Sequence, residues 1–262
     1  MRREPVGFPA TALEASEDAV LGGRLVLRQP RRGHRVGHDA ILLAAATGAK
    51  AGEHAVEFGA GVGAAGLALA ARVPGLAVAL VEIDPLLSAL AEENIRRNGL
   101  AGRVRAVALD VTAGARAFAA AGLKPGSAAR VLMNPPFNHP ATSRASPDPA
   151  RRRAHVSAGI APWLRSAARL LGAGGTLTLI WRADGLADVL AELARDFGAV
   201  TVVPVYPRPD APAVRVLVRA VKGSRAPFAL LPGLVLADAD GRPSGEAEAV
   251  LRHGAALPLA LA

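Results

Sequence analysis

The sequence contains no cysteine, which excludes disulfide bonds, thiolate metal sites and a cysteine nucleophile. It also has no uncharged apolar run of about 18 residues, which is the length that a membrane-spanning helix needs. The stretch from Met1 to Pro9 has no hydrophobic signal core, so we expect a cytoplasmic protein with no membrane partner. No set of His, Asp and Glu residues has the spacing of a metal site, and we expect no metal.

Lysine is rare, and Lys50, Lys124 and Lys222 are its only occurrences, yet the formal net charge of the 262 residues is +9. Arginine therefore carries nearly all of the positive charge. This balance favours a polyanionic partner such as a nucleic acid, although an arginine-rich composition throughout the chain would give the same charge. With 51% hydrophobic residues, the chain can bury a large core in one domain with additions.

An apolar run from Val131 to Met133 ends at Asn134-Pro135-Pro136, and Phe137 follows. Proline cannot donate to a sheet ladder, so we expect a buried strand that stops here, at the edge where open α/β sheets bind ligands. The Asn134 side-chain oxygen and the Pro135 carbonyl can each accept one N–H of a flat amino group. Phe137 offers a face on which a base can stack. The tetrad resembles the Asn-Pro-Pro-aromatic signature of S-adenosylmethionine-dependent amino methyltransferases.

A second candidate site lies where a predicted strand over residues 54–58 meets Gly59, Gly61 and Gly63. Glycines between a strand and a helix allow a tight turn and a close approach of ligand to backbone. The stretch from Gly61 to Gly66 also fits Gly-x-Gly-x-x-Gly, the fingerprint of nicotinamide dinucleotide enzymes. Glu57 precedes the first glycine and would oppose a pyrophosphate, but it suits the ammonium group of a methionine moiety.

Carboxylates also end the next two predicted strands. Glu82 lies near the end of the strand over residues 77–83, where such folds place an acid on the ribose hydroxyls. Asp84 precedes Pro85 and is expected to cap the following helix. Asp110 follows the strand over residues 103–109, where an acid can accept a hydrogen bond from the amino group of the cofactor adenine.

The rest of the chain completes an alternating pattern of strands and helices. Residues 1–20 mix charge, Pro and Ala and are expected to form a mobile arm, and residues 24–29 predict one strand of a hairpin. Asp39 is expected to be the N-cap of the next helix. Further helices are predicted over residues 156–171, 186–197 and 246–251, and further strands over residues 176–181, 199–206, 213–221 and 228–236.

Together these stretches resemble the bacterial tRNA adenine-N6 methyltransferases that act on the anticodon loop of a valine tRNA. The resemblance covers roughly residues 20–253. Its motifs are Val36-Gly37-His38-Asp39, Glu57 to Gly63, Val81-Glu82-Ile83-Asp84, Asp110, Asn134 to Phe137, and the tail from Val218 to Arg242.

The resemblance implies an α/β, Rossmann-like fold with a seven-stranded, mostly parallel sheet and helices on both faces, so that residues 21–262 form a class I methyltransferase domain. It implies the catalytic residues Asn134, Pro135 and Phe137. It further implies that S-adenosylmethionine is bound by Asp39, Glu57, Gly59, Gly61, Gly63, Glu82, Ile83 and Asp110.

Two arginine-rich stretches are the expected contacts to RNA phosphates. The first contains Arg31, Arg32 and Arg35, and the second, within a long loop over residues 138–154, contains Arg144 and the cluster Arg151, Arg152 and Arg153. A long loop beside an active site is typical of a lid or a substrate clamp. A solvated basic surface is the alternative interpretation of both stretches.

Four other functions stay open from the sequence. Phe137 stands where the adenine enzymes more often carry Tyr, and Phe there is also usual in ribosomal-RNA guanine-N2 methyltransferases. Glutamine methylation in a protein would use the same flat amide, although the basic charge argues against it. If the chain were a noncatalytic RNA-binding module, Glu57, Glu82, Asp110 and Asn134 would have no role. If it were a nicotinamide oxidoreductase, residues 134–137 would be unexplained.

Overall fold

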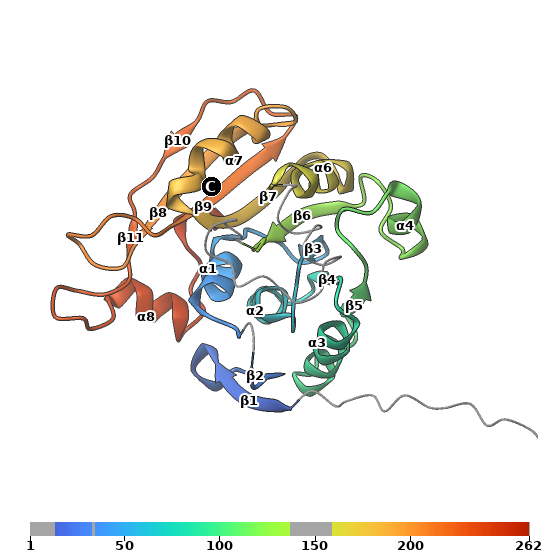
Figure 1. The fold of residues 1–262 in the computed structure, drawn as a ribbon, viewed down its shortest axis with the longest axis horizontal. Helices are drawn as coiled ribbons and strands as arrows, with labels where there is room; N and C mark the ends of the chain where they lie inside the picture. Colours follow the sequence, from blue (N-terminus) through green and yellow to red (C-terminus); the bar gives the residue numbers. More distant parts are fainter. Residues whose placement is uncertain (1–13, 33–34, 137–158, 262) are drawn as a thin grey trace, which may run out of the picture.

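The computed structural model describes residues 14–32, 35–136 and 159–261. Its centre is a nine-stranded sheet in the order β10-β8-β9-β7-β6-β3-β4-β5, with β11 also paired to β8 (Figure 1). Strand β9 runs antiparallel to both of its neighbours, and every other pair in this sheet is parallel. The strands are β3 (His54–Phe58), β4 (Ala77–Glu82), β5 (Val104–Ala108), β6 (Ala128–Met133), β7 (Leu171–Arg182), β8 (Phe197–Tyr206), β9 (Arg215–Lys222), β10 (Ala229–Leu230) and β11 (Leu234–Val235).

The α/β fold is as expected, but the expected count of seven strands is wrong. The chain after β9 runs along the outer edge of β8 and adds β10 and β11 there. One strand was expected over residues 228–236, and Pro232 lies between the two short strands that form instead. Proline has no N–H for the ladder, so a continuous strand is disfavoured at this position.

Helices cover both faces of the sheet (Figure 1). Helices α1, α2 and α3 lie on one face, and α4, α6 and α7 lie on the other. Their bounds, with those of the two carboxyl-terminal helices, are α1 (His38–Ala46), α2 (Ala64–Arg72), α3 (Pro85–Arg97), α4 (Ala115–Ala120), α6 (Ala161–Leu170), α7 (Leu186–Leu193), α8 (Gly245–Leu251) and α9 (Pro258–Leu261). No helix of the described residues combines the length and apolar character that crossing a membrane requires.

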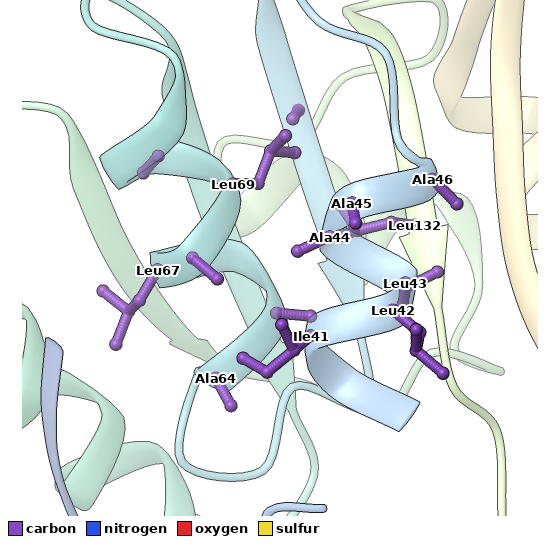
Figure 2. Packing of buried hydrophobic residues seen from close by; sticks show 14 of the residues in the cluster. Ile41, Leu42, Leu43, Ala44, Ala45, Ala46, Ala64, Leu67, Leu69 and Leu132 are labelled. Atoms are coloured by element: carbon purple, nitrogen blue, oxygen red, sulfur yellow. The ribbon is translucent and has the colours of Figure 1, made fainter. Parts of the chain in front are cut away.

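The two faces of the sheet bury different kinds of side chain. The cluster on the α1 and α2 face consists of aliphatic residues, among them many alanines. Figure 2 shows Ile41 and Ala44 of α1 on the side toward α2, with Leu132 of β6 close to the same helix. The cluster on the other face contains Phe58, Phe118 and Phe197. Small side chains let two helices approach closely, whereas the rings fill a wider space.

A separate hairpin packs beside α3. Strand β1 (Ala15–Val20) pairs antiparallel with β2 (Leu25–Pro30) across the short 3-10 turn Leu21–Gly23. The hairpin expected for residues 24–29 is confirmed, but its first strand lies within the expected mobile arm. The arm is expected from the mixture of charge, Pro and Ala over residues 1–20, which carries no information on partners elsewhere in the chain. One residue of β1, Asp18, accepts from Gln29 and from Arg35, at 2.8 Å each.

Helix ends also differ from the sequence expectation. Gly37, and not Asp39, is the N-cap of α1, so that Asp39 lies in the first turn. Asp84 caps α3 as expected and accepts from Leu86 N at 2.8 Å. Two predicted helices end early, because α6 stops at Leu170 and α7 stops at Leu193, and the strand that follows each of them begins sooner.

Candidate active site

The strand order places a switch point between β3 and β6. From β3 the chain continues to β4 and β5 on one side, and β6 and β7 then occupy the other side. Ligands of such sheets bind outside the carboxyl ends of the strands at this point. Phe58 lies opposite Met133 in the register of these two strands, so that Gly59 and Asn134, the next residues, leave the sheet side by side.

The glycine loop after β3 is held by the neighbouring strand. Gly59 and Gly61 have φ values of +64° and +54°, a region that other L-residues rarely adopt. Ala60 N donates to Val81 O at 2.9 Å, and Gly61 N donates to Glu82 Oε2 at 2.7 Å. A Cβ at Gly61 would meet no atom of the described residues within 4 Å, so that part of the molecule leaves the backbone here open to a ligand.

Glu57 is buried, and its side chain is engaged with helix α2. Its Oε2 accepts from Gly66 N at 2.7 Å, although Gly63, the N-cap of α2, supplies no side chain of its own. Burial, opposed by hydrogen bonds from Gly66 and Ala65 and reinforced by the charge of Glu82, raises the pKa of Glu57 to about 8. The expected contact of Glu57 to a methionine ammonium stays a prediction.

Glu82, Ile83 and Asp110 follow at the ends of β4 and β5. Both Glu82 oxygens accept backbone N–H groups, Oε2 from Gly61 and Oε1 from Asp84 at 2.9 Å, which fixes the carboxylate at the sheet edge. Ile83 beside it is 51% exposed and offers an apolar surface next to the Glu82 carboxylate. Asp110 Oδ1 accepts from Thr112 N and Oγ1, and no hydrogen bond to its Oδ2 is seen within the described part of the chain.

Asn134 differs from the acids of the site in the hydrogen bonding of its side-chain oxygen. Its Oδ1 is buried and, among residues 14–32, 35–136 and 159–261, no group donates to it. Pro135 is buried directly after it. Buried polar atoms are nearly always hydrogen-bonded, so this oxygen is a candidate acceptor for a ligand. Phe137, the third expected catalytic residue, lies outside the described residues.

Asp39 has a partner that no local signal in the sequence predicts. Its Oδ2 accepts from Arg215 Nε at 2.9 Å, across 176 positions of the chain. Arg215 lies opposite Arg182 in the register of β7 and β9, at the same edge as Asn134. The ion pair thus ties α1 to the sheet beside the site. The expected contact of Asp39 to the cofactor stays a prediction.

Only one of the two arginine-rich stretches is described. Arg31 and Arg32 are exposed, and Arg35 forms an ion pair with Asp18 at 2.8 Å. Arg144, Arg151, Arg152 and Arg153 lie outside the described residues, so nothing tests their contact to RNA. Within the ranges described, no cluster of three or more His, Asp and Glu side chains could hold a metal ion.

The site can hold a molecule with a diol, a flat ring and a charged tail. Open glycine backbone, a fixed carboxylate, an exposed apolar side chain and a second carboxylate follow one another across the ends of β3, β4 and β5. The order suits S-adenosylmethionine. Glu82 and Ile83 would hold its ribose and adenine, and Asp110 would accept a hydrogen bond from the adenine amino group. The glycine loop would lie against its methionine part.

Comparison with known proteins agrees with this interpretation. The sequence matches the family described as the methyltransferase small domain over residues 35–206. The crystal structure of a predicted O-methyltransferase from Agrobacterium tumefaciens is similar, with a TM-score of 0.72 and 29% identity over 84% of this chain and 98% of that chain. An S-adenosylmethionine-dependent O-methyltransferase from Thermotoga maritima shares the fold at a TM-score of 0.51 and 19% identity, over 75% of this chain and 69% of that chain. No curated protein matches the sequence.

Proposed function

Because this chain belongs to the methyltransferase small domain family and is an S-adenosylmethionine-dependent methyltransferase, we propose that its acceptor is the N6 amine of an adenine in a tRNA anticodon loop. The single observation that carries the proposal is the buried Asn134 Oδ1 without a donor among the described residues. It stands at the carboxyl end of β6, beside the glycine loop of the cofactor site.

An exocyclic amine matches the acceptors at this strand end. The amine has two N–H bonds, and Asn134 Oδ1 and the Pro135 carbonyl can each accept one of them. An alcohol has a single proton and would leave one acceptor unused. With both protons engaged, the nitrogen lone pair is free to face the sulfonium methyl group that S-adenosylmethionine supplies.

The reaction needs little acid–base help from the protein. The nitrogen lone pair forms the new bond to the methyl carbon as the carbon–sulfur bond breaks, and the electron pair of the broken bond stays on the departing sulfur, which becomes a neutral thioether. Positive charge develops on the nitrogen, and its hydrogen bond to Asn134 Oδ1 strengthens. The product ammonium is acidic enough to lose its proton to solvent. Catalysis then rests on position and on acceptor dipoles that are already in place.

RNA is the favoured carrier of the amine because the chain is strongly basic, with a formal net charge of +9. Arg31 and Arg32 are exposed in the segment just before α1. An unpaired adenine in a loop can turn out of its stack into a site without breaking base pairs.

The test uses purified protein, labelled S-adenosylmethionine and an unmodified valine tRNA transcript, followed by nucleoside mass spectrometry. We expect N6-methyladenosine, and we expect the product to be lost when the anticodon-loop adenines are replaced by guanines. A stem-loop with the same stem and a uridine loop serves as the matched control.

Three outcomes would overturn the proposal. N2-methylguanosine formed on ribosomal RNA would show that the methyl acceptor is guanine. Label in a glutamine of a protein would show that the substrate is a protein and not RNA. Ribose or other oxygen methylation would place this chain with the oxygen-methylating activity named for the structures from Agrobacterium tumefaciens and Thermotoga maritima.

A further inference from the structure

We propose that Trp163 is a positioning residue for methyl transfer, which holds the glycine loop of the cofactor site in its place beside Asn134. Trp163 lies in the first turn of α6, on the opposite side of the sheet from α2. A Cβ built on Gly59 would lie 2.7 Å from Cη2 and 3.1 Å from Cζ3 of the Trp163 ring. The indole therefore rests directly on the backbone of the loop.

The ring is itself supported by two buried phenylalanines. Trp163 meets Phe58 edge to face, with centroids 6.5 Å apart at 73°, and Phe58 meets Phe118 in the same way at 6.0 Å and 69°. Arg169 of α6 lies over Phe118, 4.9 Å from the ring centroid. The chain has only two Trp, one Tyr and six Phe, so three rings in one row form a marked concentration. Packed rings of this kind hold their geometry well.

The place of this row explains its effect on the reaction. Phe58 is the last residue of β3, and Gly59 leaves the sheet beside Asn134. The inference rests on the proposed function, in which the loop carries the methyl donor and Asn134 faces the methyl acceptor, so that a shift of Gly59 would change the distance between them. A displacement of about 1 Å can lower a rate about 100-fold. Trp163 is partly buried and also packs against the core of this face, so cofactor binding has to be measured separately from stability.

The two tryptophans allow a readout that needs no methyl acceptor. In a Trp181→Phe variant Trp163 is the only indole, and its fluorescence can be followed while S-adenosylhomocysteine is added. We expect a saturable change in emission whose midpoint agrees with the Kd from calorimetry. Trp181→Phe itself should bind with an unchanged Kd, because Trp181 packs against Gly185 and β6 separates β7 from β3 and its glycine loop.

Binding of S-adenosylhomocysteine then separates positioning from stability. On folded protein we expect Trp163→Ala to raise the Kd about tenfold, which corresponds to about 1.4 kcal/mol, and Trp163→Phe to restore it to within about threefold. If Trp163→Ala does not fold, Trp163→Leu takes its place. A wild-type Kd in the folded Ala or Leu variant would overturn the proposal, as would an indole emission that stays constant while calorimetry shows binding.

A double-variant cycle adds a test of the contact itself. Gly59→Ala should be harmful in the wild-type background, both because of its φ of +64° and because the new Cβ meets the indole. In a Trp163→Leu background the second cause is removed, so Gly59→Ala should raise the Kd by a smaller factor. Equal effects in the two backgrounds would contradict the contact.

Discussion

The ends of β3 and β4 differ sharply from the end of β6. At β3 and β4 the acids are already satisfied by this chain's own backbone, because Glu57 accepts from Gly66 N and Glu82 accepts from Gly61 N and Asp84 N. At β6 the corresponding oxygen, Oδ1 of Asn134, is buried and receives no hydrogen bond from any residue the structure describes.

The difference separates two tasks. A loop whose backbone is held by carboxylates keeps its shape before the cofactor arrives, so its side chains contribute to folding as well as to binding. An oxygen without a donor weakens the folded state, since a buried unsatisfied acceptor costs about 1–3 kcal/mol. We propose that its bond forms with the methyl acceptor, so we expect the loss of the Asn134 side chain to affect the reaction and not the fold.

Asn134→Ala should therefore have the largest effect on activity. Loss of one preorganised partner lowers comparable rates about 10²–10³-fold, and we expect that fall in single-turnover methyl transfer to tRNA with an unchanged Kd for S-adenosylhomocysteine. The Tm should stay the same or rise slightly. Asn94→Ala is the matched control, because the Asn94 side chain is buried with bonds to Arg28 and Val62 and its loss should lower the Tm. If Asn134→Ala lowered the Tm as much as Asn94→Ala does, the Asn134 side chain would contribute to folding and the comparison between the strand ends would fail.

Glu82→Ala should affect cofactor binding first. It removes the acceptor for Gly61 N and Asp84 N, which is also the acceptor that we propose for the ribose hydroxyls, and a hydrogen bond to a charged group contributes about 1.5–3 kcal/mol. Calorimetry with S-adenosylhomocysteine should show a Kd raised about 10- to 100-fold. Glu92→Ala on α3, which removes an exposed ion pair with Arg96, is the control and should bind normally. An unchanged Kd in Glu82→Ala would place the ribose elsewhere.

Gly66→Ala tests how tightly α2 packs against β3 and β4, where Glu57 accepts its hydrogen bond from Gly66 N. The new Cβ would meet Leu80 Cδ2 and, at 2.7 Å, Glu57 Oε2, so we expect a loss of about 1–3 kcal/mol in the free energy of unfolding. Gly102→Ala adds a Cβ with no atom within 4 Å and should change stability by less than about 0.5 kcal/mol. Urea unfolding of both variants checks this, and equal stabilities would show that the helix moves away without cost.

Glu57→Gln should change the pH dependence of stability. Burial raises the folded pKa of Glu57 to about 8, so the folded state holds a proton that the unfolded state releases near pH 4.5. The free energy of unfolding of the wild type should therefore fall as pH rises from about 5 to 8, by at most about 1.4 kcal/mol per pH unit from this group. The Gln variant keeps an acceptor for Gly66 N and should lack this component. Parallel curves for the two proteins over that range would contradict the raised pKa.

The sequence was most informative where chemistry depends on neighbours along the chain. The turn at Asn134-Pro135-Pro136, the glycines after Phe58 and the cap at Asp84 were predictable because proline, glycine and a short carboxylate act on the adjacent backbone. Partners from distant elements gave no such signal. Arg215 donates to Asp39 across 176 positions of the chain, and Trp163 contacts Gly59 from α6, which lies on the face of the sheet opposite α2.

The sequence by itself determined the alternation of strands and helices and the residue types at the strand ends, because periodicity and local backbone restraints are properties of short segments. Only the tertiary structure decided which strands are neighbours, and therefore that Gly59 and Asn134 stand side by side. It also decided that the Glu57 side chain accepts from Gly66 N of α2, while none of the described residues donates to Asn134 Oδ1. Hydrogen-bond satisfaction in a buried site depends on atoms that distant segments bring together, and no short stretch of sequence contains them.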